Sequence, residues 1–514
     1  MGIASSWSNE KLAYQLIIAR LSTDKYFEDS NYRLQIEDLV IKGIGGFCIF
    51  DGNTESVPKM TEQLQAIAEI PLIFSADFEN GLSMRLTEGT AFPHAMAVGH
   101  SSNPENSYKI GAAVAKESLS VGVNWNLAPV CDINSNIDNP IINIRSYGED
   151  SKIVSDNISQ FIIGSQSKKV VSCAKHFPGH GDTSTDSHLS LPVIDKSIEE
   201  LYNNELIPFI KAIEVGVWSI MIGHLHIRAI DENPIPAALS VNAINFLRNE
   251  LKYKGLILTD ALDMKSITNF VEADKASYLA LKAGNDIALV PEDALKSAEY
   301  LVDQINNDSN FRLQLEVSAE KLYNLKRKCG LIPQFALINN ETQIFNEHLK
   351  LALKVGYDAI KIEGDTSIIP IKDKLNFASF AILQKDTDLQ AANRFFTMLT
   401  QAIENDCDLG FIDKDISDED IDGYIDGIKD AELIIFPIFI KSHSYHGSVG
   451  INDNLKNAIE KLSKDKKRII ILFGSPYIKS ELNYDLLIST YSDSFASLAA
   501  AVIYLSGRSE ALNY

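Results

Sequence analysis

The sequence lacks the features that mark several classes of protein. Its five cysteines are an odd number among 514 residues, lie far apart and show no Cys-X-X-Cys spacing. A disulfide scaffold or a zinc ribbon is therefore not indicated, and we interpret these cysteines as small buried apolar residues. No apolar stretch is long enough to span a bilayer, and no Gly-X-Gly-X-X-Gly or Walker A motif signals a nucleotide.

Positive charge is scarce as well. The chain has 47 Lys and Arg against 69 Asp and Glu, a formal net charge of -22. Such a surface repels nucleic-acid phosphates and anionic membranes, so we expect neither as a partner. The N-terminus lacks the basic-then-apolar order of a secretion signal, and we expect a cytoplasmic protein. A secreted or periplasmic protein whose signal had been removed would show the same sequence.

The composition is that of a folded protein with more than one core. Apolar residues make up 45% and charged residues 23% of the chain, which argues against global disorder. The length predicts two to four domains.

In the first two thirds of the chain, eight short and mostly continuous apolar runs alternate with segments of helical periodicity such as Ser197–Glu214. The runs are Gly43–Phe50, Pro71–Asp77, Val123–Pro129, Val170–His176, Val217–His224, Pro236–Ser240, Gly255–Asp260 and Asp286–Val290. Strands buried on both faces read in this way, and their alternation with helices predicts an α/β fold, a (β/α)8 TIM-like barrel with insertions. The run at Pro236–Ser240 fits less well because it is very short and begins at a proline.

After Gly330 the pattern resets. Ile332–Thr342 is typical of a linker, and Gln343–Tyr357 of a helix. Five more apolar runs follow, partly separated by helical stretches, at Phe377–Leu383, Asp408–Ile412, Leu433–Phe439, Arg468–Phe473 and Asp485–Ser489. They predict a smaller, doubly wound α/β sandwich domain. We therefore expect a catalytic barrel over residues 1–335, a linker and connecting helix over 336–360, and the α/β sandwich over 361–514.

Polar side chains gather where the apolar runs end. They are Asp51, Asp77, Asp132, Lys175, His176, His224, Ser240 and Asp260. In a barrel the carboxyl ends of the strands share one face, where catalytic residues gather. Polar residues also simply mark the ends of strands, but so many in register favour a functional face.

The stretch Lys175–His188 holds three His, two Asp, one Lys and two Gly. Asp186 and His188 are two residues apart, close enough for the carboxylate to accept a hydrogen bond from the imidazole in a turn. Such a bond fixes the tautomer and raises the basicity of the ring, as an acid/base pair needs.

Two other interpretations of this stretch compete. Metal ligation by His176, His180, Asp182 or His188 is disfavoured, because Pro178 and the two glycines that flank His180 argue against a helical i,i+4 pair of ligands. A structural role in satisfying a long loop fits His180, Asp182 and Thr183.

Asp260 ends an apolar run and is flanked by small residues. A carboxylate fixed there suits a nucleophile or an electrostatic stabiliser. The common alternative, an Asp that caps the next helix, fits Asp263 better. Two further groups, Asp77–Arg85 and Asn143–Asp150, contain carboxylates and guanidinium groups that suit sugar hydroxyls, although either alone could form a surface salt bridge.

Together these motifs resemble glycoside hydrolase family 3. Lys175–His188 is similar to the Lys-His-Phe-Pro-Gly-His-Gly-Asp-Thr…Asp-Ser-His signature of its bacterial-type β-N-acetylglucosaminidases, and Thr259–Met264 resembles its nucleophile motif. Asp77–Arg85 is similar to the motif Asp-X-Glu-Gly-Gly-X3-Arg, with Asn80 in place of a glycine, and Asn143–Asp150 to a further arginine motif. The resemblance covers roughly residues 10–330 and, less sharply, the α/β sandwich domain.

The resemblance implies a retaining, exo-acting enzyme that hydrolyses terminal β-linked N-acetylglucosamine from peptidoglycan- or chitin-derived fragments. Its partner would be a small carbohydrate, with no cofactor or metal and no particular oligomeric state indicated. Asp260 would form a covalent glycosyl-enzyme, and His188, oriented by Asp186, would protonate the leaving oxygen and then deprotonate water. The residues implied to bind the sugar are Asp77, Arg85, Arg145, Lys175, His176 and His224.

Two other functions stay open. A neutral imidazole repels anions less than a carboxylate does, so phosphate could replace water and make the protein a β-N-acetylglucosaminide phosphorylase with the same residues. The other is a catalytically inactive sugar-binding protein, against which the intact Asp260, Asp186 and His188 argue. Glucosidase activity is less expected, because related β-glucosidases have a different motif after the Lys-His pair.

Overall fold

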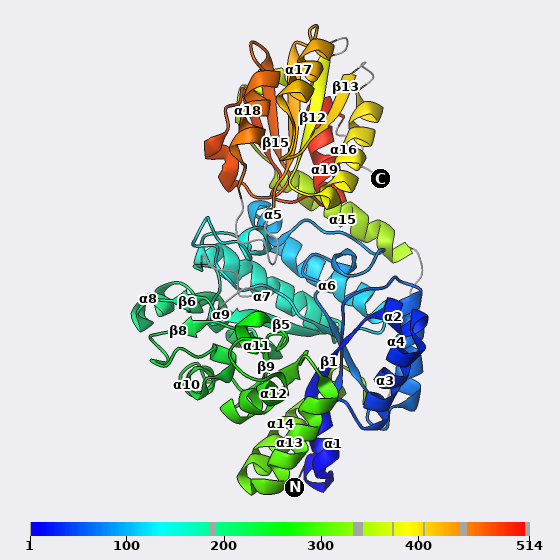
Figure 1. The fold of residues 1–514 in the computed structure, drawn as a ribbon, viewed down its shortest axis with the longest axis vertical. Coiled ribbons are helices and arrows are strands. Elements are labelled where there is room, and N and C mark those ends of the chain that lie inside the picture. Colours follow the sequence, from blue (N-terminus) through cyan, green and yellow to red (C-terminus); the bar gives the residue numbers. More distant parts are fainter. Residues whose placement is uncertain are drawn as a thin grey trace. The chain divides into compact units, whose positions relative to one another are not determined.

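The computed structural model describes residues 2–183, 191–332, 343–372, 375–403, 407–441 and 450–508. The chain forms two compact units (Figure 1). The first comprises Met1–Thr90, Ser107–Asn136 and Glu149–Phe345, and the second Ala91–Asn106, Ile137–Gly148 and Asn346–Tyr514.

The first unit is built on a parallel sheet with the strand order β10-β1-β2-β3-β4-β5-β7-β9. The strands are β1 (Ile17–Leu21), β2 (Gly46–Ile49), β3 (Ile73–Ala76), β4 (Trp125–Asn126), β5 (Val171–Phe177), β7 (Ser219–Ile222), β9 (Leu256–Thr259) and β10 (Ala288–Leu289). Ile17 of β1 pairs with Ala288 of β10, and a parallel bridge joins Leu258 to Ile287. The sheet therefore curls round on itself, which confirms the predicted (β/α)8 barrel. A short parallel pair, β6 (Val193–Ile194) and β8 (His226–Ile227), lies outside the barrel sheet.

The structure corrects one strand of that prediction. Pro236–Ser240 is not a strand: Ala237–Leu239 form a 3-10 turn, η4, and Ser240 caps helix α10 (Val241–Asn245). Proline has no amide hydrogen to donate to a sheet ladder, which is consistent with this outcome. The missing strand is β1, which follows helix α1 (Asn9–Gln15) after the single residue Leu16, with no Gly or Pro to mark the boundary.

Helices surround this sheet, drawn from blue to green in Figure 1. Besides α1 and α10 they are α2 (Thr23–Glu28), α3 (Ser30–Ile41), α4 (Ser56–Ile67), α6 (Glu105–Ser120), α7 (Ser151–Ser167), α8 (Ile198–Asn203), α9 (Leu206–Glu214), α11 (Lys265–Thr268), α12 (Ala273–Ala283), α13 (Ala294–Asn307) and α14 (Ser309–Lys328). Several begin at an Asp whose carboxylate accepts backbone N–H groups, as Asp150 does for α7. The predicted helical segment Ser197–Glu214 is split into α8 and α9.

The second unit has a six-stranded sheet in the order β11-β16-β15-β14-β12-β13. Its strands are β11 (Lys361–Gly364), β12 (Phe377–Leu383), β13 (Cys407–Ile412), β14 (Leu433–Phe439), β15 (Lys467–Leu472) and β16 (Leu486–Ser489), and its helices are α5 (Ala95–His100), α15 (Gln343–Ala359), α16 (Leu389–Ala402), α17 (Asp418–Gly427), α18 (Asp453–Leu462) and α19 (Phe495–Ser506). Only β11, among the strands described, runs antiparallel to its neighbour. The remaining order is that of a doubly wound flavodoxin-like sheet, as predicted.

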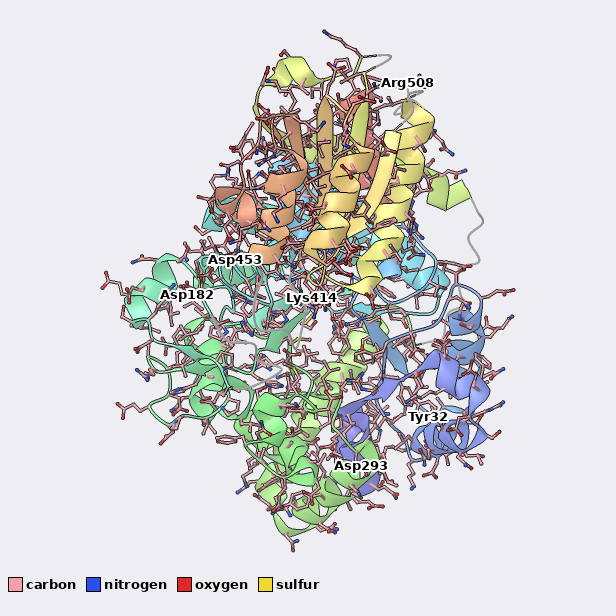
Figure 2. The ribbon with its side chains drawn as sticks, turned by 45° about the horizontal axis from the view of Figure 1, so that its top comes forward. Tyr32, Asp182, Asp293, Lys414, Asp453 and Arg508 are labelled. Carbon is pink, nitrogen blue, oxygen red and sulfur yellow. The ribbon has the colours of Figure 1, made fainter. Side chains whose placement is uncertain are left out.

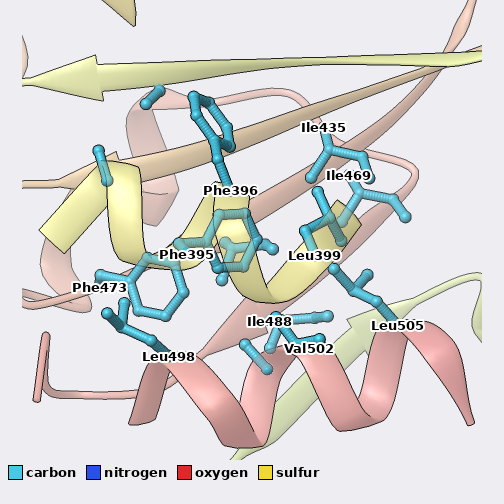
Figure 3. Packing of buried hydrophobic residues seen from close by; sticks show 14 of the residues in the cluster. Phe395, Phe396, Leu399, Ile435, Ile469, Phe473, Ile488, Leu498, Val502 and Leu505 are labelled. Carbon is cyan, nitrogen blue, oxygen red and sulfur yellow. The ribbon is translucent and has the colours of Figure 1, made fainter. Parts of the chain in front are cut away.

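Alternate residues of these strands enter two separate cores. Helices α16 and α19 cover one face, where Phe395 and Val502 pack against Ile435 and Ile488 (Figure 3). Helices α17 and α18 cover the other face, where their apolar side chains share a core with strand residues such as Ile470. Because successive side chains of a strand point to opposite faces, continuous apolar runs are what a sheet covered on both sides requires.

Two segments from within the barrel sequence fold with this second unit. The His94 ring Nδ1 lies 2.9 Å from Ser492 Oγ, and the His100 ring stacks on Tyr491 at 3.8 Å between centroids. Ile144 shares a small apolar cluster with Tyr491. The second unit therefore carries the turn η3 (Asn143–Arg145), which includes one of the predicted sugar-binding residues.

Candidate active site

The predicted site residues of the first unit lie at the carboxyl ends of barrel strands. Asp77 follows β3, and Lys175 and His176 are near the carboxyl end of β5. His224 follows β7, and Asp260 follows β9. Because all these strands are parallel, their carboxyl ends share one face of the barrel, the face on which barrel enzymes place their active sites.

Four charged side chains come together at the ends of β3 and β5. Lys175 Nζ lies 2.7 Å from Asp77 Oδ1, and Arg85 Nη2 lies 2.5 Å from Asp77 Oδ2. Lys175 also contacts Glu79 Oε1 at 2.8 Å. The Lys175 side chain is only 2% exposed, so this ammonium group depends on its two carboxylate partners.

The network holds Asp77 in its ionised form. Burial raises the pKa of this carboxyl, but Lys175 and Arg85 outweigh burial and hold the pKa well below its usual range. Burial lowers the pKa of the Arg85 guanidinium, and Asp77 more than compensates, so that the net shift is upward. Fixed carboxylate and guanidinium groups of this kind accept from and donate to sugar hydroxyls.

A second polar cluster surrounds Asp132, which is fully buried. Its Oδ2 lies 2.7 Å from His176 Nδ1, and its Oδ1 accepts the backbone N–H of His180 at 2.7 Å. Burial raises the pKa of Asp132, but His176 reverses the shift, and the net direction is downward. Burial, followed by the neighbouring His176, lowers the pKa of His180 to about 4. In the neutral form of the ring, a carboxylate that accepts Nδ1–H leaves Nε2 of His176 as a hydrogen-bond acceptor.

Asp132 and Glu79 were not among the predicted site residues, although both were visible in the sequence. Asp132 ends an apolar run, and Glu79 lies two residues after Asp77 in the same motif. Its position at a strand end was the sequence signal for Asp132. Glu79 had no sequence signal beyond its place in the motif. Asp132 supports His176, and Glu79 supports Lys175.

Asp260 lies at the end of β9, partly exposed. Its backbone N–H donates to Ile222 O at 2.9 Å, which ties it to β7. The fully buried His224 donates Nε2–H to Ala261 O at 2.9 Å and so holds the backbone next to Asp260. The charge of Asp260 also reaches the buried thiol of Cys173 on β5, whose pKa burial raises to about 12.

Asp263 does not cap the following helix. Helix α11 has Met264 at its N-cap, and Asp263 Oδ2 instead lies 2.6 Å from Arg20 Nη2 at the end of β1. The expectation that Asp263 rather than Asp260 would cap was therefore wrong for Asp263, because an arginine distant in sequence competes for its carboxylate.

The two remaining predicted catalytic residues, Asp186 and His188, lie outside the described residues. On either side of that stretch, Lys196 Nζ contacts Asp182 Oδ2 at 3.0 Å (Asp182 is labelled in Figure 2) and the buried Glu205 Oε1 at 2.6 Å. The predicted structural role of Asp182 agrees with this ion pair. Arg145 belongs to the second unit, where its Nη1 donates to Ile141 O at 3.3 Å.

In the part of the chain that the structure describes, no group of three or more His, Cys, Asp or Glu side chains is arranged to hold a metal ion. Likewise, none of the described helices is long and apolar enough to cross a membrane.

A closed (β/α)8 barrel with paired carboxylates and cations at the carboxyl ends of its strands defines a barrel enzyme. Residues 13–325 match the model of the glycosyl hydrolase family 3 N-terminal domain. The chain belongs to this family, as its motifs predicted.

The chain is similar to the following three proteins. Beta-hexosaminidase A of Pseudoalteromonas piscicida is 30% identical over 429 residues, covering 76% of this chain and 70% of that protein. A glycoside hydrolase family 3 beta-N-acetylglucosaminidase from Paenibacillus sp. str. FPU-7 has a similar structure, with a TM-score of 0.86, 24% identity, and coverage of 98% of this chain and 97% of that one. A beta-glucoside phosphorylase, BglX, also superimposes with a TM-score of 0.86 at 22% identity, covering 98% and 93%.

Proposed function

We propose that this chain is an exo-acting, retaining glycosidase that hydrolyses terminal β-linked N-acetylglucosamine. The network of the buried Lys175 with the partly exposed Asp77 and Arg85, on the same barrel face as Asp260, carries the proposal. It offers fixed donors and acceptors for one sugar unit beside a partly exposed carboxylate. The 30% identity to a beta-hexosaminidase supports the choice of sugar.

In the proposed reaction, an oxygen of Asp260 attacks the anomeric carbon while the bond to the leaving oxygen breaks. His188 gives its proton to that oxygen, and Asp186 orients the imidazole. Water then attacks the glycosyl-Asp ester, returns a proton to His188 and frees Asp260. An imidazole serves both steps because its unperturbed pKa, about 6.5, lies near working pH.

The backbone around Asp260 suits a nucleophile. Ile222 O accepts the backbone N–H of Asp260, and His224 donates a hydrogen bond to Ala261 O. These two bonds fix the backbone at the end of β9, while the Asp260 carboxylate stays accessible. The negatively charged ionised form is the reactive one, and small neighbours allow the sugar to approach.

Trapping the glycosyl-enzyme tests this proposal. A slow fluorinated N-acetylglucosaminide should label one peptide, and mass spectrometry should find the added sugar on Asp260. Asp260→Ala should lose turnover of a p-nitrophenyl N-acetylglucosaminide by about 10⁴-fold or more, and added azide should restore release of p-nitrophenol as a glycosyl azide forms. Asp263→Asn, a neighbouring carboxylate held by Arg20, is the matched control and should keep most activity.

Label on another residue, or full turnover by Asp260→Ala, would refute the nucleophile assignment. Wild-type protein that binds N-acetylglucosamine without cleaving any glycoside would favour the inactive sugar-binding protein.

Phosphorolysis is the second candidate, favoured by the imidazole expected as acid/base in place of a carboxylate. The same turnover assay with and without phosphate, with detection of N-acetylglucosamine 1-phosphate, separates the two. Free N-acetylglucosamine as the sole product in excess phosphate would establish water as the acceptor.

A further inference from the structure

The loop that carries Arg85 is closed at its base. It begins with the turn η2 (Leu82–Met84), and at its other end Gly89 has a φ of +104°. A Cβ on Gly89 would lie 2.6 Å from Leu82 Cβ, so the two ends of the loop touch. Such a contact and such a backbone angle both require glycine. The position of Arg85 therefore depends on where this neck is held.

A buried carboxylate on the helical layer of the barrel holds the neck. Glu117 lies on α6, and its side chain is only 1% exposed. Its Oε1 accepts the hydroxyl of Thr90 at 2.5 Å, and its Oε2 accepts the backbone N–H of Thr90 at 3.0 Å. Thr90 is the residue after Gly89, and both of its donors are used on one carboxylate.

The contact between Glu117 and Thr90 matters energetically because the Glu117 carboxylate is buried. A buried carboxylate is costly unless hydrogen bonds replace its hydration. Thr90 supplies two such bonds from the loop. The other hydrogen bonds described for the loop are backbone bonds or lie nearer the surface, such as Thr87 N–H to Gly52 O at 3.0 Å.

We propose that Glu117 is a positioning residue for the sugar site: by fixing Thr90 it fixes the neck of the loop 82–90 and hence the Arg85 guanidinium against Asp77. The inference rests on the proposed function in one respect, because it takes Arg85 to bind the sugar. Glu117 itself touches neither Arg85 nor the sugar in this proposal.

Kinetics of three variants test it. Arg85 binds the sugar in both ground and transition states, so its displacement raises KM more than it lowers kcat. Glu117→Ala should raise KM for a p-nitrophenyl N-acetylglucosaminide about tenfold with kcat nearly unchanged. Glu117→Gln, which keeps one acceptor, should have a smaller effect, and so should Thr90→Val, which removes only the hydroxyl. These two milder variants carry the test if Glu117→Ala does not fold.

A double-mutant cycle separates positioning from stability. In an Arg85→Ala background, Glu117→Ala should change KM no further, because both act through one guanidinium. The matched control is Asp286→Asn, another carboxylate that is 1% exposed, bound to Arg248 ahead of β10 at the opposite end of the barrel. It should lower the unfolding temperature and leave KM unchanged.

Glu117→Ala that lowers the unfolding temperature with an unchanged KM would overturn the inference, and so would additive effects of Glu117→Ala and Arg85→Ala. If Arg85→Ala alone left KM unchanged, the sugar-binding role of Arg85 would be the part that failed. If the wild-type protein turned over no N-acetylglucosaminide at all, the result would instead count against the proposed function.

Discussion

The substitution Asp132→Asn tests most directly the buried cluster of Asp132, His176 and His180. The carboxylate offers two acceptor oxygens, and two different donors use them at 2.7 Å: the ring Nδ1–H of His176 and the backbone N–H of His180. An asparagine of the same shape offers one acceptor and one NH2 donor. One of the two histidine donors must then face another donor.

The ring can escape this conflict only by changing its tautomer. His176 would take a proton on Nε2 and accept the new NH2 through Nδ1. Its Nε2 would then donate where it accepted before, and any sugar hydroxyl that donates to it would lose its partner. A lost hydrogen bond to a charged or buried group costs about 1.5–3 kcal/mol. We therefore expect kcat/KM to fall roughly 10- to 150-fold and the free energy of unfolding to fall by about 1.5–3 kcal/mol.

The pH dependence gives an independent check. The pKa of Asp132 is lowered in the folded protein. Its contribution to stability is therefore present above the unfolded pKa, about 4, and is lost as pH falls through the lower folded value. The difference in unfolding free energy between wild type and Asp132→Asn should be largest near neutral pH and shrink below about pH 4.

Denaturant unfolding, steady-state kinetics and ¹⁵N NMR of the imidazole measure the three effects. Wild-type kcat/KM in a destabilised Asp132→Asn variant would refute the tautomer argument. A His176 ring that keeps its proton on Nδ1 in the variant would do the same.

Further predictions concern two buried lysines. Lys326 is fully buried, and burial lowers its pKa to about 7 from 10.5, so Lys326→Met should stabilise the protein by about 5 kcal/mol at pH 6. Because the depressed pKa disfavours folding only below about pH 10.5, the gain should shrink to about 1 kcal/mol at pH 9.5, as measured by denaturant unfolding; an equal gain at both pH values would contradict this. Lys175→Met removes a cation that lowers the pKa of Asp77, so the acid limb of kcat/KM should move to higher pH while KM rises, and an unmoved limb would show that Asp77 is not titrating there.

The sequence predicted those parts of the fold that carry a strong local pattern. Strands buried on both faces must be apolar throughout, so most barrel strands and five strands of the second sheet stood out. The strands that were missed lack that contrast. β1 follows α1 after the single residue Leu16, and β11 exposes residues such as Lys361 and Glu363 at an edge of the sheet.

The site was predictable only in part, for a related reason. Strand-end positions and motifs indicated Asp77, Lys175 and Asp260 as candidates, but several ion pairs at this barrel face join segments that are distant in sequence. Asp77 and Lys175 are 98 positions apart, and Arg20 and Asp263 are 243 apart. Such pairs form only once the barrel closes, and no local pattern announces them. The same holds for residues 137–148, which lie within the barrel sequence yet fold with the second unit.

The two polar clusters of the barrel face contain four groups whose pKa values are shifted away from neutral pH. Asp77 and Asp132 have lowered pKa values, that of Arg85 is raised, and that of His180 falls to about 4. All four groups therefore keep one charge state from about pH 5 upward through neutral pH. Asp77 and Arg85 therefore present a constant acceptor and a constant donor to a neutral sugar. The pH response of catalysis near neutrality must then come from groups outside this set, which is what an acid/base imidazole such as that proposed for His188 would supply.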